Sequence, residues 1–311
     1  MWSSARRPGV VSLLLLATAR GAPQKPTIKS LGTCSVVSTS GQLAAHEDGA
    51  RIDAANAVVR LGWGATTPAM VAYIGNRTDL RLASNTAFNE NRNVSRAVVH
   101  AAMRTMSEGS RVLIFTLSGW CMPAVHAVAG CYSGLDVAYV PTSDVLIRVA
   151  QRSLHRHAGV PGTARGLPTT GLISIFYLLL SGMCDTLQLW GFYDDRTTLN
   201  MSYHHFTSGE GTEGDNETTV AMYVRKLQIG GHDFASEHAM LLNRSIDRLR
   251  RGIGAVGRPL VLTRASLLHG EAAPRTIPAA VEARPARPSL NDSCAYPKCG
   301  SNQRSRTTSK G

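Results

Sequence analysis

The segment that decides the fold reads Cys34-Ser-Val-Val-Ser-Thr-Ser-Gly-Gln-Leu43. Its first half has the apolar character of a short buried strand, and its second half is a small polar turn that contains a glycine. In an open α/β sheet, ligands bind at the carboxyl ends of strands, where such a turn lets backbone N–H groups approach a phosphate. The pattern also fits an ordinary turn, because many strands end in Ser-Gly. The segment therefore predicts one strand of an α/β sheet, followed by a candidate binding turn.

Further β-rich runs follow this strand, and segments of helical length separate them. The expected strands are Cys34–Thr39, Ala57–Leu61, Met70–Gly75, Val112–Leu117, Val137–Pro141 and Leu187–Phe192. The expected helices include Asp144–His157, Thr170–Met183 and Ser236–Arg251. This alternation predicts a single, largely parallel sheet with helices on both faces. From about residue 252 the pattern gives way to Pro, Ala, Arg and Ser, so we expect a folded domain over 30–268 and a disordered basic tail over 269–311.

The net charge of +12 lies at the two ends of this 311-residue chain. Residues 1–29 contain five basic and no acidic side chains, and residues 250–311 contain eleven basic and three acidic ones. The chain between them therefore has a net charge of −1. A nucleic-acid-binding domain should have a basic face on its folded body. The charge distribution therefore argues against a nucleic-acid partner.

The N-terminus has the features of a targeting segment. Arg6 and Arg7 precede the apolar run Val10–Ala17, and Ala17-Thr18-Ala19 has small residues at the spacing of a cleavage site. The run is about half the ~20 residues that a membrane-spanning helix needs. Residues 1–29 are therefore interpreted as a cleaved signal peptide or a short signal-anchor with a stem, and less readily as a buried helix. The signal-anchor alternative would associate the protein with a membrane.

Asparagine and cysteine usage point to an oxidising lumen. Six of the eleven asparagines start an Asn-x-Ser/Thr triplet, the acceptor pattern for N-glycans: Asn76, Asn93, Asn200, Asn216, Asn243 and Asn291. The six cysteines form no CxxC pair, which favours disulfides over a zinc site. Cys294 and Cys299 could form a small disulfide loop, a zinc knuckle or two unpaired tail cysteines. The sequence does not determine the partners of Cys121 and Cys131.

A second candidate site is the segment Arg165-Gly-Leu-Pro-Thr-Thr-Gly171, which precedes a run that is apolar nearly all round. Pro168, Thr169 and Thr170 favour a helix start, so the apolar run should be a buried helix. Its N-terminus would offer hydroxyls, a glycine and unpaired N–H groups to an anion or a ribose. An ordinary helix cap would have the same sequence.

A third candidate site is Gly230-Gly-His232-Asp-Phe-Ala-Ser-Glu237, which leads into the last expected helix. Ala239, Leu242, Ile246 and Leu249 should form its apolar face, and Gly252 could end it. His232 lies just before the positive end of the helix, which disfavours an imidazolium and favours a neutral ring that can accept a proton. Glu237 is expected to complement the helix dipole. A structural or solvated loop histidine is the simpler interpretation of His232.

These segments, in this order and spacing, resemble the animal-type sialyltransferases, the family with sialylmotifs L, S, III and VS. The resemblance covers roughly residues 34–245. The large motif matches Cys34–Gly41, Gly49–Asp53, Ala57–Arg60 and Ile74–Arg81; the small motif matches Pro168–Gly171, Cys184-Asp185 and Leu189–Phe192; the third motif matches His205 within Tyr203–Phe206; and the very small motif matches His232 and Glu237.

The resemblance implies a GT-A-type variant with a single Rossmann-like sheet, working on a CMP-activated donor without a metal or other cofactor. It implies that the donor is bound by Ser40, Gly41, Gln42, Thr169, Thr170, Gly171 and Gly191. His232 falls where the family has its general base, and His205 falls where the family contacts the donor phosphate. Cys34 and Cys184 match the family's disulfide. The implied partners are the donor and a glycan of a glycoprotein or glycolipid, in the Golgi lumen, at the Golgi membrane or after secretion.

Three positions depart from the family pattern. Gly62 stands where many members have a donor-contacting Asn, Gln42 where they often have Asn, and Leu167 where they often have Tyr. These differences leave the donor open among CMP-sialic acid, CMP-Kdn and CMP-Kdo. The acceptor glycan, the linkage and the oligomeric state are also left open.

Three other functions are less consistent with the sequence. A methyltransferase would need a GxGxG-type turn, and a serine hydrolase would need Gly-x-Ser-x-Gly; neither is present. A catalytically inactive glycan-binding relative is the remaining alternative. The presence of both His205 and His232 argues against it.

Overall fold

The computed structural model covers the whole chain, and the structure is described for the parts of it that follow. They are residues 30–88, 96–116, 122–132, 134–141, 144–158, 167–192, 201–202, 204–205, 232–245, 259–268, 274, 277 and 279–282. None of the helices in these parts has the length and apolar character that a membrane span requires.

The centre of the fold is an eight-stranded sheet with the strand order β7-β6-β1-β2-β3-β4-β5-β8. Its strands are β1 (Thr33–Val37), β2 (Ala57–Leu61), β3 (Leu80–Ser84), β4 (Arg111–Thr116), β5 (Asp136–Pro141), β6 (Thr186–Trp190), β7 (Leu260–Thr263) and β8 (Val281–Glu282). Strands β1 to β6 are parallel, whereas β7 and β8 pair antiparallel at the two edges. The predicted single, mostly parallel α/β sheet is therefore confirmed.

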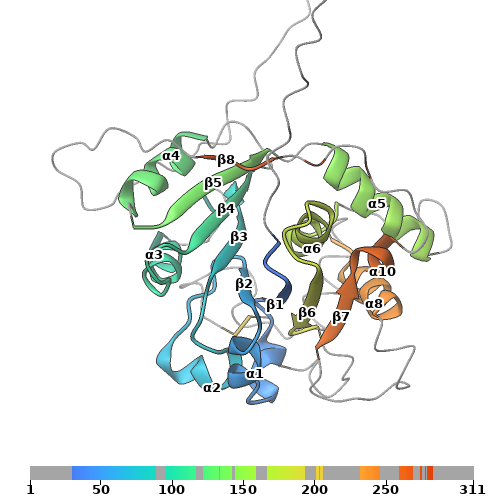
Figure 1. Ribbon diagram of the computed structural model, residues 1–311, viewed down its shortest axis with the longest axis horizontal. Helices are drawn as coiled ribbons and strands as arrows, with labels where there is room; N and C mark the ends of the chain where they lie inside the picture. Colours follow the sequence, from blue (N-terminus) through green and yellow to red (C-terminus); the bar gives the residue numbers. More distant parts are fainter. Residues whose placement is uncertain are drawn as a thin grey trace, which may run out of the picture.

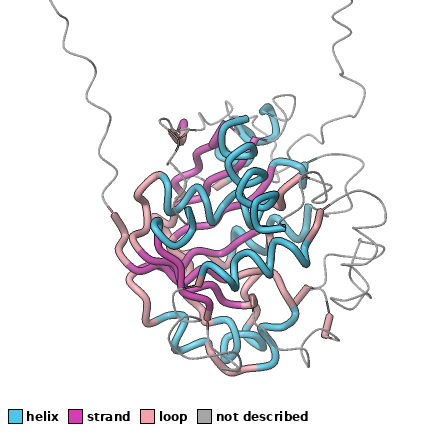
Figure 2. Tube along the Cα trace, turned by 90° about the vertical axis from the view of Figure 1, so that its right-hand side faces the viewer, coloured by secondary structure: helices cyan, strands magenta, loops and turns pink. Residues whose placement is uncertain are grey.

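Helices cover both faces of the sheet (Figure 1). One layer contains α5 (Asp144–Ala158), α6 (Thr170–Leu180), α8 (Phe234–Arg244) and α10 (Arg264–Leu268), which form one hydrophobic core with the strands. The other layer contains α1 (Gly49–Asp53), α2 (Val71–Ile74), α3 (Arg96–Arg104) and α4 (Met122–Cys131), with the short 3-10 helices η1 (Gly41–Ala45), η2 (Pro68–Met70) and η3 (Asn85–Phe88). From the side shown in Figure 2, the first layer lies in front of the strands.

The strand order changes direction at β1. From β1 the chain adds β2, β3, β4 and β5 on one side, and then returns to add β6 on the other side of β1. Ligands of open α/β sheets bind at such a switch point, beyond the carboxyl ends of the strands. The turn after β1 and the turn after β6 lie at this position.

The prediction of a strand over Met70–Gly75 was wrong. This segment forms the end of η2 and the whole of α2, because Pro68 favours a helical start and Gly75, with a φ of +70°, ends the helix. The strand follows instead at Leu80–Ser84, where all five residues are buried. It was missed because the charged Arg81 stands in the middle of an otherwise apolar run.

The last expected helix also differs from the prediction. It begins at Phe234 and ends at Arg244, and residues 246–252 lie outside the described part of the chain. Its buried face contains Glu237, Met240 and Leu241, whereas Ala239 is exposed. The buried face therefore differs from the predicted face of Ala239, Leu242, Ile246 and Leu249.

The ordered sheet continues past the domain end predicted at residue 268. The short strand β8 pairs with β5, and its Glu282 carboxylate lies 2.8 Å from a guanidinium nitrogen of Arg111. Residues 1–29 and 283–311 lie outside the described residues.

Cys34 and Cys184 form a disulfide across a sequence separation of 150 residues. Cys34 lies in β1, and Cys184 lies two residues before β6, the strand that pairs with β1. Both cysteines are buried. The pairing implied by the family resemblance is therefore confirmed, and the bridge ties together the two strands at the switch point.

Candidate functional site

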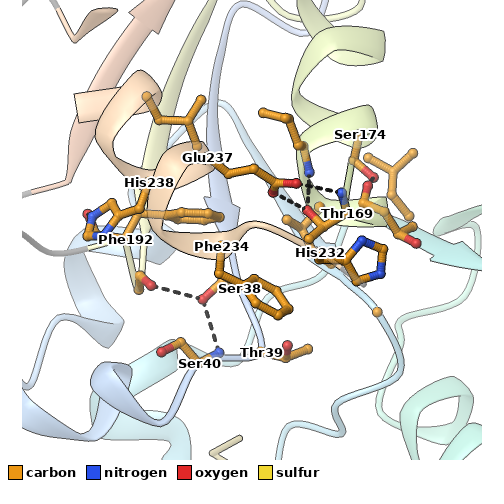
Figure 3. A pocket seen from close by; sticks show the side chains of 18 of the residues that line it. Ser38, Thr39, Ser40, Thr169, Ser174, Phe192, His232, Phe234, Glu237 and His238 are labelled. Atoms are coloured by element: carbon orange, nitrogen blue, oxygen red, sulfur yellow. Dashed lines mark hydrogen bonds between the residues drawn. The ribbon is translucent and has the colours of Figure 1, made fainter. Parts of the chain in front are cut away.

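A cavity of about 290 Å³ lies at the switch point, between the carboxyl ends of the central strands and the N-termini of α6 and α8 (Figure 3). Its lining comes from the turn after β1 (Ser38, Thr39, Ser40, Gln42), from β2 and β3 (Leu61, Gly62, Leu82), from α6 (Thr169, Thr170, Gly171, Leu172, Ser174), from the end of β6 (Gly191, Phe192) and from α8 and its approach (His232, Phe234, Glu237, His238, Leu241). The cavity thus brings six separate stretches of the sequence together, the three candidate sites among them.

The turn after β1 is held by side-chain hydrogen bonds. The Ser38 hydroxyl donates to the Gly191 carbonyl at 3.4 Å and accepts from the Ser40 N–H at 3.1 Å (Figure 3). The Ser40 hydroxyl in turn accepts from the Gln42 N–H at 3.2 Å and caps η1. Two neighbouring strand ends are therefore joined into one wall of the cavity.

Gly191 is required where it stands. Its φ is +81°, and a Cβ at this position would lie 2.2 Å from the Ser38 hydroxyl oxygen. Any other residue would suffer both an unfavourable backbone conformation and a steric clash.

The N-terminus of α6 forms the opposite wall. Thr169 is its N-cap, and its hydroxyl accepts from the Leu172 N–H at 3.0 Å, as the predicted helix start requires. Thr170 and Gly171, in the first turn, also line the cavity. The first N–H groups of a helix have no partner within it, and the helix dipole adds positive potential there. This wall is therefore suited to an anion.

Helix α8 directs a second N-terminus at the same cavity. Asp233 is its N-cap and accepts from the Ser236 N–H at 3.0 Å. No arginine or lysine is among the described residues that line the cavity. Two helix ends and neutral hydrogen-bond donors therefore provide its attraction for an anion.

The ring of His232 has a defined tautomer. Its Nδ1 lies 2.6 Å from the Leu167 carbonyl oxygen. A carbonyl can only accept, so Nδ1 carries the proton and Nε2 is the basic nitrogen of the neutral ring. Leu167 is two residues from Thr169, which places the basic ring beside the anion-binding wall. A histidine oriented in this way by a second group has the arrangement of a general base.

Glu237 joins the two helix ends. One carboxylate oxygen accepts from the Thr169 N–H at 2.7 Å, and the other accepts from the Thr169 hydroxyl at 2.6 Å (Figure 3). Burial raises the pKa of the Glu237 carboxyl from 4.5 to about 7, although the hydrogen bonds from Thr169 oppose this shift. The ionised carboxylate accepts both bonds. Glu237 lies in the first turn of α8, as expected, and in addition forms a buried link between α8 and α6.

Replacing Glu237 with glutamine should remove a pH dependence from the stability of the fold. The carboxyl ionises near 4.5 in an unfolded chain but near 7 in the folded protein. The folded state holds the proton between these values, so this group lowers wild-type stability, on the order of 3 kcal/mol, as the pH rises through this window. Urea unfolding at several pH values should show that loss in wild type and not in Glu237→Gln.

The matched control for this measurement is Glu47→Gln, which changes an exposed glutamate near the turn after β1. Its pH profile should follow that of the wild type. A Glu237→Gln profile parallel to the wild-type profile between pH 4.5 and 7 would show that the carboxyl is not the titrating group.

His205 lies behind the cavity and not in its lining. Its backbone N–H donates to the Thr39 carbonyl at 3.1 Å, and the adjacent His204 forms an isolated antiparallel β-bridge with Ser40. Burial, together with the neighbouring positive charge of Arg60, lowers the pKa of His205 to about 3. His205 is therefore a neutral ring at physiological pH.

Seven of the predicted site residues line the cavity together, and two do not. The seven are Ser40, Gln42, Thr169, Thr170, Gly171, Gly191 and His232. Gly41 is buried beside them, where a Cβ would lie 1.9 Å from the Ser202 carbonyl oxygen, and His205 lies behind Thr39. Gly41 thus allows the 201–205 segment to approach the turn after β1.

Sequence reasoning missed several lining residues. Ser38 was inside the quoted turn but has the appearance of an ordinary strand end. His238 follows Glu237 in α8, and its Nε2 lies 3.1 Å from the Phe192 carbonyl oxygen. The rings of Phe192 and Phe234 also line the cavity and provide flat apolar surfaces. Their positions depend on contacts between distant segments, which no local pattern indicates.

The model of glycosyltransferase family 29 (sialyltransferase) matches residues 5–243. The chain belongs to this family. It is thus a sialyltransferase-family glycosyltransferase, as the motifs had indicated. A comparison with curated proteins gave no match.

Among solved structures, this family 29 chain is similar to two crystal structures of a mammalian sialyltransferase. One is a complex with Gal-beta-1-3GalNAc-ortho-nitrophenol; it is 18% identical, with a TM-score of 0.38, and the match covers 64% of this chain and 67% of that one. The other is 19% identical, with a TM-score of 0.36, and covers 64% and 66% of the two chains. The match thus spans about two thirds of the mammalian chains.

No group of three or more His, Cys, Asp or Glu side chains that could hold a metal ion occurs in the described parts of the chain. Asp194 and Asp195, which are adjacent in the sequence and so do not form an Asp-x-Asp motif, lie outside these parts.

Proposed function

We propose that this protein transfers a sialic acid, or a related nonulosonic or ulosonic acid, from a CMP-activated donor to a glycan hydroxyl with inversion. The observation that carries the proposal is the position of the basic His232 nitrogen in the same cavity as two helix N-termini. Family membership supports the reaction class.

The phosphate of the donor would lie against the first turn of α6. Thr170 and Gly171 provide backbone N–H groups there, and no arginine or lysine in the described cavity lining competes with them. The planar base can stack on one of the aromatic rings, Phe192 or Phe234, because every base has a π-face. Ser40, Gly41, Gln42 and Gly191 would shape the rest of the donor pocket.

In the reaction, the acceptor hydroxyl loses its proton to Nε2 of His232. The hydroxyl oxygen forms a bond to the anomeric carbon as the bond from that carbon to the phosphate oxygen breaks, and CMP leaves with the electron pair. The partial charge of the α6 N-terminus stabilises the negative charge that develops on the phosphate. His205, being neutral, is proposed to assist as a hydrogen-bond donor and not as a counter-charge.

The chain is proposed to act in the Golgi lumen, attached to the membrane by its N-terminal segment or released from it. The buried disulfide supports an oxidising compartment. The acceptor is proposed to be a glycan of a glycoprotein or glycolipid, and the reaction is proposed to require no metal.

The test is a CMP-release assay with CMP-sialic acid, CMP-Kdn and CMP-Kdo against a glycan array that includes Gal-β1-3-GalNAc. We expect acceptor-dependent release with at least one donor, unaffected by chelation of divalent metals, and no reaction with a UDP-sugar. Stabilisation by CMP without turnover of any donor would favour an inactive glycan-binding relative.

A further inference from the structure

Two arginines lie side by side inside the sheet, and their surroundings differ. Arg60 of β2 and Arg81 of β3 occupy paired positions in neighbouring parallel strands, so their side chains share one face of the sheet. Both are buried, Arg81 with an exposed fraction of 0%. Buried guanidinium groups ordinarily have a full set of acceptors or an acidic partner.

Arg60 has the acceptors that a buried guanidinium needs. Its Nε donates to the Thr78 hydroxyl at 2.8 Å, and its Nη2 donates to the carbonyls of Ile74 at 2.9 Å and Gly75 at 3.0 Å. Asp53 also favours its charge electrostatically.

Arg81 has acceptors on one nitrogen alone. Its Nη1 donates to the carbonyls of Gly62 at 2.9 Å and Gly64 at 3.0 Å. Nε and Nη2 have no hydrogen-bond partner in the described structure, although both are sealed from solvent. These two atoms form the edge of the guanidinium that binds a carboxylate or another anion through two parallel hydrogen bonds.

The local charge around Arg81 is positive and uncompensated. Burial, and to a smaller extent the charge of Arg60, lower the pKa of Arg81 to about 9, so the group remains protonated at neutral pH. Both arginines also act on His205, whose pKa falls to about 3 mainly through burial. A buried charge without an opposite charge is strongly destabilising.

Among the described residues, a third donor without a partner lies in the loop after β2, the loop whose carbonyls accept from Arg81. The Thr66 hydroxyl is buried and also has no partner in the parts of the chain that the structure describes. Thr66 is two residues beyond Gly64, whose carbonyl binds Arg81. The loop after β2 therefore contacts Arg81 through two carbonyls and carries an orphaned donor of its own.

We propose that the Nε–Nη2 edge of Arg81 and the Thr66 hydroxyl bind a small monovalent anion, with chloride as the natural occupant. The anion supplies the negative charge that Arg81 lacks, and it accepts hydrogen bonds without needing to donate any. The site lies next to the donor cavity, because Gly62 both accepts from Arg81 and lines the cavity. This inference is independent of the proposed reaction.

The test is thermal unfolding in sodium chloride mixed with sodium gluconate at constant ionic strength. Binding to the folded state raises the melting temperature as the chloride concentration exceeds the dissociation constant. We expect this rise for the wild type and for Arg152→Met, which removes an exposed arginine of α5. Arg81→Met should show no dependence on chloride.

Thr66→Val provides the second arm, in case Arg81→Met does not fold. If the hydroxyl binds no anion, its removal should leave the stability unchanged or raise it, and the melting temperature should depend on chloride as in the wild type. If the hydroxyl binds the anion, the variant should need a chloride concentration at least about tenfold higher than the wild type for the same stabilisation. A wild-type melting temperature independent of chloride, or full dependence retained in Arg81→Met, would overturn the proposal.

Discussion

Replacing Cys34 and Cys184 together with alanine should lower the free energy of unfolding by about 5 kcal/mol, because the disulfide closes a very long loop in the unfolded chain. The sequence separation is 150 residues, and the loop includes every strand from β1 to β5 and helix α6. A small or medium domain has a stability of about 5–15 kcal/mol in total. Urea unfolding, with the slope checked for a change in the denatured state, measures the loss.

The single variants provide the control for this prediction. Either replacement breaks the same bond, so Cys34→Ala and Cys184→Ala should each reproduce most of the effect of the double variant. Additive losses would show that packing of the two buried side chains, and not the cross-link, is responsible. An unfolding midpoint that is the same for oxidised and reduced wild-type protein would contradict the prediction directly.

The bridge also bears on the site, because it fixes β1 against β6 below the turns that form the cavity. Ser38 and Gly191 are joined at the upper ends of the same two strands. Loss of the disulfide should therefore weaken donor binding in parallel with stability.

Local chemistry explains why much of the site could be predicted. Thr169 was recognisable as a helix cap because its hydroxyl satisfies an N–H group within three residues. The turn after β1 was recognisable because an apolar strand ends abruptly in small polar residues. Both signals depend on neighbours in sequence, and both segments line the cavity as expected.

The parts that were missed depend on contacts between distant residues. Glu237 has a first-turn position that fits a solvent-facing acid, yet it accepts two hydrogen bonds from Thr169, 68 residues away. Strand β3 was not predicted because the buried Arg81 interrupts its apolar pattern. In each case a charged residue is buried by tertiary structure against its usual preference.

The protonation state of His205 also depends on distant residues, so the sequence did not predict it. The third motif identified the residue, but its neutral state follows from burial and from Arg60, which is 145 positions earlier in the chain. The family pattern indicates a phosphate contact for His205, whereas burial in this fold keeps its ring neutral.

The largest effect on activity is expected at His232. His232→Ala should lower kcat about 10²–10⁴-fold, the usual contribution of a positioned general base. Donor binding should be largely retained, because the first turn of α6 and the turn after β1 are unchanged. Steady-state kinetics for CMP release, together with the dissociation constant of CMP, separate the two effects.

The pH profile provides a further check on the base. Protonation of Nε2 removes the acceptor, so kcat/KM of the wild type should fall on the acidic side as His232 becomes charged. The residual activity of His232→Ala should lack this limb. Added imidazole should restore part of the turnover of the variant, since the truncated side chain leaves space beside Leu167.

A structural role for His232 predicts a different result. The hydrogen bond to the Leu167 carbonyl joins the approach to α8 with the approach to α6. If that were its whole contribution, His232→Ala would lose melting temperature and activity together, and His232→Gln, which can still donate to a carbonyl, would recover both. With a catalytic base, His232→Gln should fold well and remain inactive.

A well-folded His232→Ala protein with a near wild-type turnover rate would exclude the residue from the mechanism. Glu237, whose buried carboxyl lines the same cavity and has a pKa raised to about 7, would then be the next candidate for the base.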